Sequence, residues 1–476
     1  MAILCQDNSS RPGNTREMLD LISRHVTDRS ARGIATTISR LVSSGELVVG
    51  ARLPTVRDLS KTLGVSPTTV GEAWRALADI GAIETLGRNG SFVRQPTGPG
   101  APRRYRRVVA DPDNRGHFAL DLSTGTPDAR LLPDLGPALA RVSSQSLTSS
   151  YLDHAVLPEL EAALRARWPF SPDEITVVDG AMDALDRVAQ VVVHLGDRVV
   201  VEHPTFPPLL DLLEQIGAEV IGVSLDDEGM LVEQLVEALR LDPVAVFLQP
   251  RAQNPTGITM TAKRAEAIAR AISASKHGAN VVIVEDDHSG DIARGALASI
   301  GHHLPEQTVH IRSFSKSHGP DLRLAAIGGV GSVIATAANR RLLGPGWSSR
   351  ILQAVLLELL DDHRTVDALA RARDEYAARR RAFAEVLHEN GVTTTGTDGI
   401  NLWVHVADER SALMTLAAQG IGAAPGEPFM VSGAGEYPAA IRLTVGLVGV
   451  DDDAEKVALA VAAAARLESS ARRGPR

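Results

Sequence analysis

The sequence predicts a multidomain chain: a small, mostly α N-terminal domain, then a large α/β domain that ends in a small C-terminal α+β subdomain. Three observations lead to this prediction. The length of 476 residues allows two or three domains. Apolar residues follow helical spacing up to about residue 80, whereas from about Leu120 short apolar runs alternate with helical patterns, which is typical of a mostly parallel sheet. The charge is uneven: residues 31–107 carry 12 Lys/Arg and 5 Asp/Glu, a balance of +7, while the whole chain has a net charge of −9.

A basic segment on an acidic body is expected of a nucleic-acid-binding module joined to another kind of domain, although a solvated charge bias gives the same pattern. The apolar content of 44% supports a large core. A single cysteine, Cys5, excludes a disulfide framework or a cysteine metal site within the chain. No apolar run reaches about 18 residues, and Met1–Asn14 has neither the charge nor the apolar core of a signal peptide. We therefore expect a cytoplasmic protein with no metal site and no membrane partner.

Helix caps and apolar spacing define the N-terminal elements. Residues 1–28 are polar without clear periodicity and are expected to be flexible. Three helices follow. The second is predicted to begin at Thr55, with Asp58 at the capping-box position, and to end at Gly64; the third begins after Ser66 as N-cap. The inward faces of the first and third helices are Ile34, Ile38 and Leu41, and Val70, Trp74 and Leu77.

Two short strands, Ile83–Glu84 and Ser91–Val93, flank the turn Gly87–Gly90. Three helices and a glycine-tipped hairpin are the pattern of a winged helix-turn-helix, whose third helix enters the DNA major groove. The sequence here resembles the GntR-type DNA-binding domain, which we expect over residues 29–95. The motifs that carry the resemblance are Arg52-Leu53-Pro54, Arg57-Asp58-Leu59, Leu63-Gly64-Val65-Ser66, Thr68-Thr69-Val70 and Gly90-Ser91-Phe92-Val93.

The resemblance implies a set of residues that contact double-stranded operator DNA. Hydroxyls and amides at a helix N-terminus suit phosphates, and an arginine can reach phosphate or guanine. Pro67 and Gly71 stand where this family often has arginines, and Glu72 is acidic, so we expect weak base readout with more affinity from phosphates or dimerisation. The alternative is a helical domain with no DNA role. The expected DNA contacts are Arg57, Ser66, Thr68, Thr69 and Gly90.

Residues 96–118 are expected to form a linker, because prolines and glycines there oppose regular structure. Four arginines surround Tyr105 in this segment, at positions 103, 104, 106 and 107. A soluble linker is the simpler interpretation, and an extra contact with the DNA backbone is the functional one.

The large domain is expected over residues 119–470, with its small subdomain over about 365–470. Its polar motifs follow apolar strands, and ligands gather at the carboxyl ends of parallel strands. Alone, each motif has an ordinary interpretation: Asn254-Pro255-Thr256-Gly257 is a good turn, and Lys316 could be a surface lysine in a serine-rich loop. The motifs are, in order, Asp179-Gly180-Ala181-Met182, Pro204-Thr205-Phe206, Asn254 to Gly257, Glu285-Asp286-Asp287-His288, Ser313-Phe314-Ser315-Lys316-Ser317 and Arg323.

In that order the motifs resemble the fold-type I pyridoxal phosphate enzymes of the aminotransferase class I/II group. The resemblance implies that Lys316 forms a Schiff base with the cofactor and that Asp286 pairs with its pyridine nitrogen. Asn254 would bond the ring hydroxyl oxygen, and Phe206 would stack on the ring. Arg442 would hold a substrate carboxylate, unless it is a plain surface arginine. The expected phosphate ligands are Ala181, Met182, Ser313, Ser315 and Arg323. A cis bond before Pro255 is also implied.

Two positions depart from that family. His288 stands where a tyrosine usually bonds the ring oxygen, and a histidine is expected to titrate near neutrality. Ala181 replaces a usual Ser or Thr and removes one phosphate hydroxyl. Both departures weaken the expectation of efficient catalysis.

Together the two domains resemble the MocR-type bacterial regulators. We expect a transcriptional regulator that binds pyridoxal phosphate through Lys316 and senses an amino compound or the cofactor itself. Fold-type I proteins build their site at a subunit interface, so a homodimer is implied, with Tyr151 reaching the partner's phosphate. The alternatives are an active aminotransferase that retains a DNA-binding domain and a regulator whose body binds no cofactor. The effector, the operator, and whether it activates or represses do not follow from the sequence.

Overall fold

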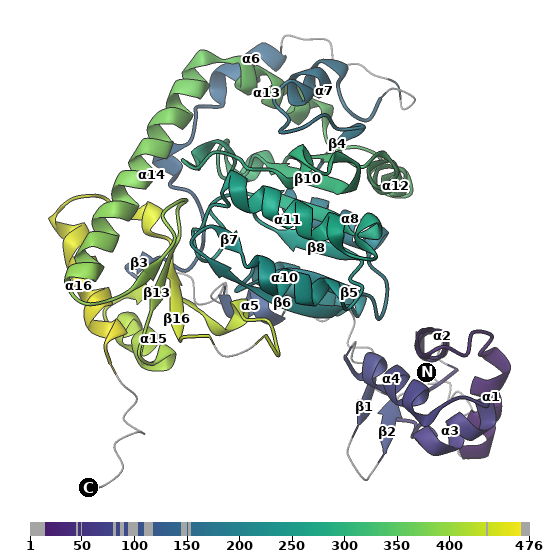
Figure 1. Cartoon of the computed structure of the whole chain (residues 1–476). Coiled ribbons are helices and arrows are strands. Elements are labelled where there is room, and N and C mark those ends of the chain that lie inside the picture. Colours follow the sequence, from purple (N-terminus) through teal and green to yellow (C-terminus); the bar gives the residue numbers. More distant parts are fainter. Residues whose placement is uncertain are drawn as a thin grey trace, which may run out of the picture. The chain divides into compact units, whose positions relative to one another are not determined.

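The computed structural model describes residues 15–43, 46–48, 50–79, 82–85, 90–93, 103–108, 118–143, 150, 154–434 and 437–467. The chain forms two compact units, one built mainly from residues up to Ala101 and the other mainly from Pro102 onward. Figure 1 labels the elements of both units.

The N-terminal unit contains the predicted helices and hairpin. The predicted caps are confirmed: Thr55 accepts a hydrogen bond from the Asp58 N–H (3.1 Å) and donates one to its carboxylate (2.6 Å), and Gly64 ends its helix with φ +68°. Ser66 accepts from the Thr68 N–H at 3.2 Å. The elements are α1 (Thr15–His25), α2 (Ala31–Ser43), α3 (Val56–Leu63), α4 (Pro67–Asp79), β1 (Ile83–Thr85) and β2 (Ser91–Val93), and β1 pairs antiparallel with β2.

The expectation that residues 1–28 are flexible is wrong for their last part. Residues 15–25 form α1, and Met18 and Ile22 are buried in the same core as Ile34, Leu59 and Trp74. The apolar spacing of Met18 and Ile22 is helical, but the pattern covers only two turns and is easily missed among charged neighbours.

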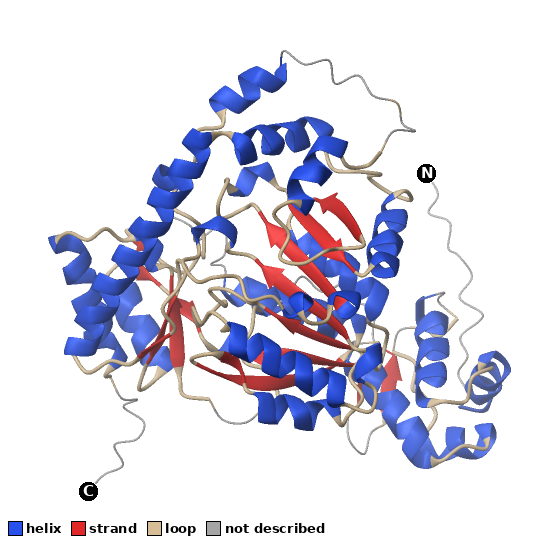
Figure 2. Cartoon of the chain, turned by 45° about the horizontal axis from the view of Figure 1, so that its top comes forward, coloured by secondary structure: helices blue, strands red, loops and turns tan. Residues whose placement is uncertain are grey.

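The second unit is organised around an eight-stranded sheet with the order β4-β11-β10-β9-β8-β5-β6-β7. Strands β5, β8, β9 and β10 run parallel, whereas β11 is antiparallel to both β10 and β4. Helices cover both faces of this sheet (Figure 2), and the four residues of β8 are all buried. The strands are β4 (Glu174–Val178), β5 (Arg198–His203), β6 (Glu219–Asp226), β7 (Gly229–Met230), β8 (Ala245–Leu248), β9 (Val282–Asp287), β10 (Thr308–Ser313) and β11 (Ala325–Gly329).

The helices of this unit lie before, between and after the strands of the large sheet. They are α6 (Gly136–Ser143), α7 (Pro158–Arg165), α8 (Ala181–Val192), α9 (Pro207–Ile216), α10 (Val232–Leu239), α11 (Ala262–Ala274), α12 (Gly331–Arg341), α13 (Arg350–Asp361) and α14 (His363–Glu389). The long α14 runs from beside the large sheet to the small subdomain (Figure 1). No described helix is long and apolar enough to cross a membrane.

The small subdomain has the predicted α+β character. Its sheet has the order β12-β13-β16-β15 and packs on the helices α15 (Glu409–Ala418) and α16 (Asp452–Ala465). A strand from the start of the unit, β3 (Leu120–Asp121), pairs with β14 (Ile421–Gly422), so residues 118–125 belong spatially to this subdomain. The other strands are β12 (Thr394–Thr395), β13 (Leu402–His405), β15 (Ala424–Pro425) and β16 (Ala440–Leu443).

Part of the predicted linker is a helix, α5 (Arg103–Val108). Val108 is buried among Trp403, Ala424, Phe429 and Ala440 of the small subdomain. The expectation of an irregular linker throughout 96–118 is therefore wrong for residues 103–108, because apolar burial of Val108 holds them in place.

Candidate functional site

Five parallel strands bring the residues of the site, some of them predicted and some not, to one edge of the large sheet. Asp179 and Gly180 follow β4, and Glu202 and His203 end β5. Gln249 follows β8, Asp286 and Asp287 end β9, and Lys316 lies three residues beyond β10. Since these strands place their carboxyl ends at the same edge, residues separated by up to about 140 positions meet there.

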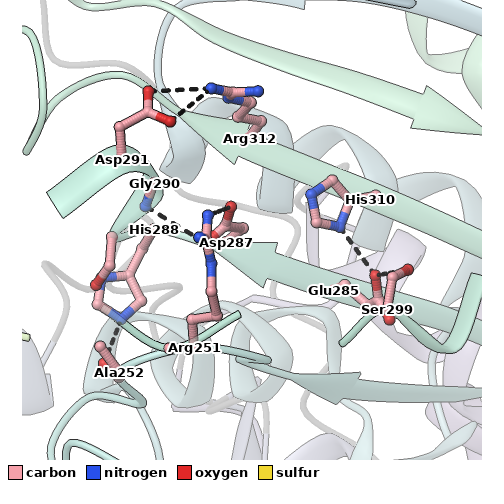
Figure 3. Close-up of polar contacts among 12 residues, drawn as sticks. Arg251, Ala252, Glu285, Asp287, His288, Gly290, Asp291, Ser299, His310 and Arg312 are labelled. Atoms are coloured by element: carbon pink, nitrogen blue, oxygen red, sulfur yellow. Dashed lines mark hydrogen bonds and ion pairs between the residues drawn. The ribbon is translucent and has the colours of Figure 1, made fainter. Parts of the chain in front are cut away.

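Lys316 contacts His288 directly. Its Nζ lies 2.8 Å from His288 Nδ1. The other ring nitrogen, Nε2, lies 3.0 Å from the Ala252 carbonyl oxygen and therefore carries the proton that it donates (Figure 3). With Nε2 protonated in the neutral ring, Nδ1 accepts the hydrogen bond from the lysine.

The pKa values of both His288 and Lys316 are lowered at this site. Burial lowers the pKa of His288 well below its usual value, and the charge of Lys316 acts in the same direction. The expectation that His288 titrates near neutrality is therefore wrong, because burial of the imidazole disfavours its charged form. Burial and the guanidinium of Arg442 lower the pKa of Lys316 to about 7, against the opposing effect of Asp286. At neutral pH a large share of Lys316 is thus a neutral amine.

The two carboxylate oxygens of Asp286 differ in their hydrogen-bond partners. Its Oδ2 accepts a hydrogen bond from Gln249 Nε2 at 2.7 Å, whereas the buried Oδ1 has no partner among the described residues. Burial raises the pKa of Asp286 to about 6, so the carboxylate remains mostly ionised at pH 7. A buried, ionised and half-satisfied carboxylate is costly unless a positively charged donor completes it.

Of the three consecutive strand residues Glu285, Asp286 and Asp287, Asp286 alone has a side-chain oxygen with no partner in the part of the chain that the structure describes. Glu285 accepts from Ser299 (2.7 Å) and contacts His310 (2.9 Å). Asp287 is bonded by Arg251 at 2.6 and 3.1 Å (Figure 3). Side chains alternate along a strand, so Glu285 and Asp287 face away from Asp286.

Gln249 connects three residues of the site and was not predicted. Besides its bond to Asp286, its side-chain oxygen accepts from the Asn254 N–H at 2.8 Å, and its own N–H donates to Glu202 Oε2 at 3.0 Å. Burial raises the pKa of Glu202 to about 8, and the nearby Asp286 charge adds to the effect. At pH 7 Glu202 is therefore a neutral acid behind the ionised Asp286. The only sequence signal for these residues was their position at strand ends.

Arg442 reaches the same site from the small subdomain. It is buried, and its guanidinium donates to Asn254 Oδ1 at 3.2 Å and to the Ser123 carbonyl. It also lies over the ring of Phe429, 5.2 Å from the centroid. Burial lowers the pKa of Arg442 to about 10, so it stays cationic. Arg442 is thus no surface arginine, and its Nε has no partner among the described residues.

The N-terminus of α8 faces an arginine. Gly180 has φ +102° and caps the helix without a side chain, and a Cβ at this position would lie 2.9 Å from Arg323 Nη2. Arg323 itself has φ +49° and donates to the Asp179 carbonyl at 3.1 Å. The predicted amides of Ala181 and Met182 begin α8 at this point. An arginine beside free helical N–H groups is a suitable place for an anion.

The other predicted residues make fewer contacts within the described part of the chain. Phe206 lines a cavity of about 10 Å³ together with Glu202, Gln249 and Asp286. Ser313 is buried, and its hydroxyl accepts from the Ser315 N–H at 3.4 Å. The Asn254–Pro255 bond is cis, as the resemblance implied. Tyr151 lies outside the described residues.

The predicted DNA-contact residues lie on the N-terminal unit. Arg57, Ser66 and Thr68 are exposed and Thr69 is half-buried, at the starts of α3 and α4. Gly90 has φ +98° before β2, and a Cβ there would lie 3.0 Å from Arg52 Nε. Arg52, which pairs with Phe92 of the hairpin, is a basic residue at the wing that the prediction omitted.

Comparisons with known proteins agree with both units. The aminotransferase class I and II family matches residues 119–460, and the gntR family of bacterial regulatory proteins matches residues 30–93. The vitamin B6 salvage pathway transcriptional repressor PtsJ of Salmonella typhimurium is 35% identical over 416 residues, which cover 86% of this chain and 93% of that protein. The probable rhizopine catabolism regulatory protein MocR of Rhizobium meliloti is 27% identical and covers 79% of each chain.

Solved structures support the fold of the second unit. An archaeal alanine:glyoxylate aminotransferase superposes with a TM-score of 0.65 at 23% identity, over 73% of this chain and 90% of that one. The predicted combination of domains is confirmed. The chain belongs to the MocR-type transcriptional regulators, in which a gntR-family DNA-binding domain precedes a domain of the aminotransferase class I and II family.

Proposed function

We propose that this regulator binds pyridoxal phosphate at the edge of the large sheet and changes its DNA binding in response. The observation that carries the proposal is the buried Oδ1 of Asp286, which has no hydrogen-bond partner among the residues that the structure describes. An ionised, buried carboxylate oxygen without a donor suits a protonated pyridine nitrogen, which is both a cation and a hydrogen-bond donor. When bound, pyridoxal phosphate supplies an aldehyde that condenses with a primary amine and a ring that withdraws electrons.

Residues of the chain fit the other parts of the cofactor. Lys316 supplies an amine whose lowered pKa keeps it nucleophilic near neutrality. His288 Nδ1 accepts a hydrogen bond from that amine and holds it in place. Asn254, whose Oδ1 accepts from Arg442, would bond the ring hydroxyl oxygen. Arg323 and the first amides of α8 would hold the phosphate, and Ser313 and Ser315 would add hydroxyls.

Two signals are compatible with the site. PtsJ is by name a repressor of vitamin B6 salvage, which favours the cofactor itself as the signal. The buried, cationic Arg442 favours a carboxylate in addition, hence an amino acid or a related amino compound. We propose that the cofactor is the primary ligand and that a carboxylate-bearing amine bound at Arg442 modulates it. The protein would act as a cytoplasmic homodimer on operator DNA, with Arg57, Ser66, Thr68, Thr69 and Gly90 at the DNA surface.

A second candidate is an active aminotransferase. The presence of Lys316, Asp286 and Arg442 at one site favours it, because that set would suffice to bind both the cofactor and an amino acid. Steady production of keto acid, in excess over protein and requiring Lys316, would support this candidate over a regulator without turnover.

The test is the visible absorbance of purified protein after addition of pyridoxal phosphate, with Lys316→Ala as the control. A lysine-bound cofactor band in the wild type alone is expected. DNA from upstream of the protein's own gene is then titrated with and without cofactor, and with an amino acid panel. A wild-type spectrum that equals that of the control would contradict cofactor binding through Lys316.

A further inference from the structure

The helix α5 contacts the segment that packs under Arg442. Arg104 donates through its guanidinium to the Met430 carbonyl oxygen at 2.6 Å, and its N–H donates to both oxygens of Asp211 at 3.1 Å. Val108, at the other end of the helix, is buried against Trp403 and Phe429. The helix lies beside the small sheet that contains β16 (Figure 1).

The segment 427–431, which begins with a short 3-10 helix at Glu427–Phe429, touches the site with its other side. The ring of Phe429 lies 5.2 Å below the Arg442 guanidinium. The Phe429 carbonyl accepts from the Thr205 N–H at 2.9 Å, one residue before Phe206. The Val431 N–H donates to His203 Nδ1 at 3.2 Å. This short segment thus contacts α5, the Arg442 guanidinium and the end of β5, which leads to Phe206.

The small sheet provides a second connection between α5 and Arg442. Trp403 on β13 is paired in register with Arg442 on β16, and Ala424 on β15 is paired with Arg442 as well. Directly paired residues of antiparallel strands share a face, so Trp403, Ala424 and Arg442 are neighbours on one surface. Val108 and Phe429 cover that surface. The Arg442 guanidinium is therefore packed between the site and residues held by α5.

We propose that α5 is a positioning element for Arg442, so that a carboxylate bound there and the docking of α5 stabilise each other. The inference rests on the proposed carboxylate role of Arg442. Binding free energies are reciprocal: if docked α5 improves carboxylate binding by some factor, the carboxylate strengthens α5 docking by the same factor. α5 lies in the segment that leads from the DNA-binding domain to the large domain. A carboxylate bound at Arg442 would therefore also strengthen the docking of this segment on the large domain.

The experiment compares two ligands that differ in the carboxylate. Phosphopyridoxyl-L-leucine carries one and pyridoxamine phosphate does not, and the affinities of both for the full-length, cofactor-free protein are measured by calorimetry. In Arg104→Ala the affinity for phosphopyridoxyl-L-leucine is expected to fall about three- to tenfold, because the half-buried, charged hydrogen bond that holds the segment beside Arg442 is lost. The affinity for pyridoxamine phosphate is expected to stay unchanged. Arg104→Lys, which retains one donor for Met430, should recover part of the loss.

Arg103→Ala is the matched control, since it removes the same charge from an exposed position of the same helix. Hydrogen exchange of residues 103–108 is the second readout: phosphopyridoxyl-L-leucine should slow it in the wild type and not in Arg442→Ala. A variant Arg104→Ala that binds both ligands as the wild type does, or that loses both equally, overturns the inference. If the wild type binds neither ligand, the proposed function fails and the inference with it.

Discussion

The protonation of Lys316 yields a quantitative prediction about cofactor capture. Its pKa of about 7 follows from burial and from the Arg442 charge. With that pKa about half of the amine is neutral at pH 7, whereas an ordinary lysine with a pKa of about 10.4 is neutral in fewer than about one molecule in a thousand. Only the neutral amine attacks an aldehyde.

The rate of pyridoxal phosphate capture should therefore rise only about twofold between about pH 7 and pH 9, and level off above about pH 8. An ordinary lysine would give a rise of nearly a hundredfold over the same interval. The assay is stopped-flow absorbance of the lysine-bound cofactor band across that range. Arg442→Ala should move the midpoint upward, because a neighbouring cation that lowers the lysine pKa is removed. A rate that keeps rising tenfold per pH unit up to about pH 9 would refute the assignment of a buried, neutralised lysine.

Three further predictions concern Asp286, Glu202 and α1. Asp286→Asn should weaken pyridoxal phosphate binding by about ten- to hundredfold in an absorbance titration, because the charged acceptor is lost. The control is Asp291→Asn, at a partly exposed carboxylate that pairs with Arg312 and not with the site residues. Equal affinities of the two variants would argue against the role of Asp286. Burial raises the pKa of Glu202 from 4.5 to about 8, so between these pH values the folded state holds a proton that the unfolded state has lost, and the stability of the wild type should fall as the pH rises. Glutamine does not titrate, so in urea unfolding of the cofactor-free protein the stability of Glu202→Gln relative to wild type should rise by about 1.4 kcal/mol per pH unit between about pH 5 and pH 8. A difference that does not change with pH would contradict this prediction. Ile22→Ala should destabilise the N-terminal unit by about 2–5 kcal/mol in thermal unfolding, because it leaves a cavity in the core. The control Asp20→Ala, at an exposed position of the same helix, should change stability by less than about 0.5 kcal/mol. An unchanged melting temperature for Ile22→Ala would show that α1 lies outside the core.

The polar residues at the ends of the strands could be predicted, because a strand end is recognised from the few residues around it. Asp286 and Lys316 each follow a short apolar run, and buried parallel strands can be read from such runs. The caps Thr55, Gly64 and Ser66 were predictable for the same reason, since a cap depends on residues within three or four positions. All of these features were confirmed.

The partners of the site residues were not predictable. Gln249 stands in a segment that looks like an ordinary strand end, yet it bonds Glu202, Asp286 and Asn254. The protonation of His288 was predicted wrongly, because a side chain's pKa depends on burial and on charges such as Lys316 that are distant in sequence. The helix α5 was missed because six residues carry too little periodicity to be recognised.

The sequence by itself determined which domains are joined, the order of the strands along the chain and the identity of the reactive groups. Apolar periodicity, caps and short motifs act over a few residues, so they can be read without coordinates. Only the tertiary structure decided the strand order in space, the meeting of Arg442 with Asn254 and the contact of Arg104 with Met430. It also decided that one oxygen of Asp286 has no partner among the described residues. Each of these depends on packing between segments up to hundreds of residues apart, and the electrostatics of a buried group is a property of that packing.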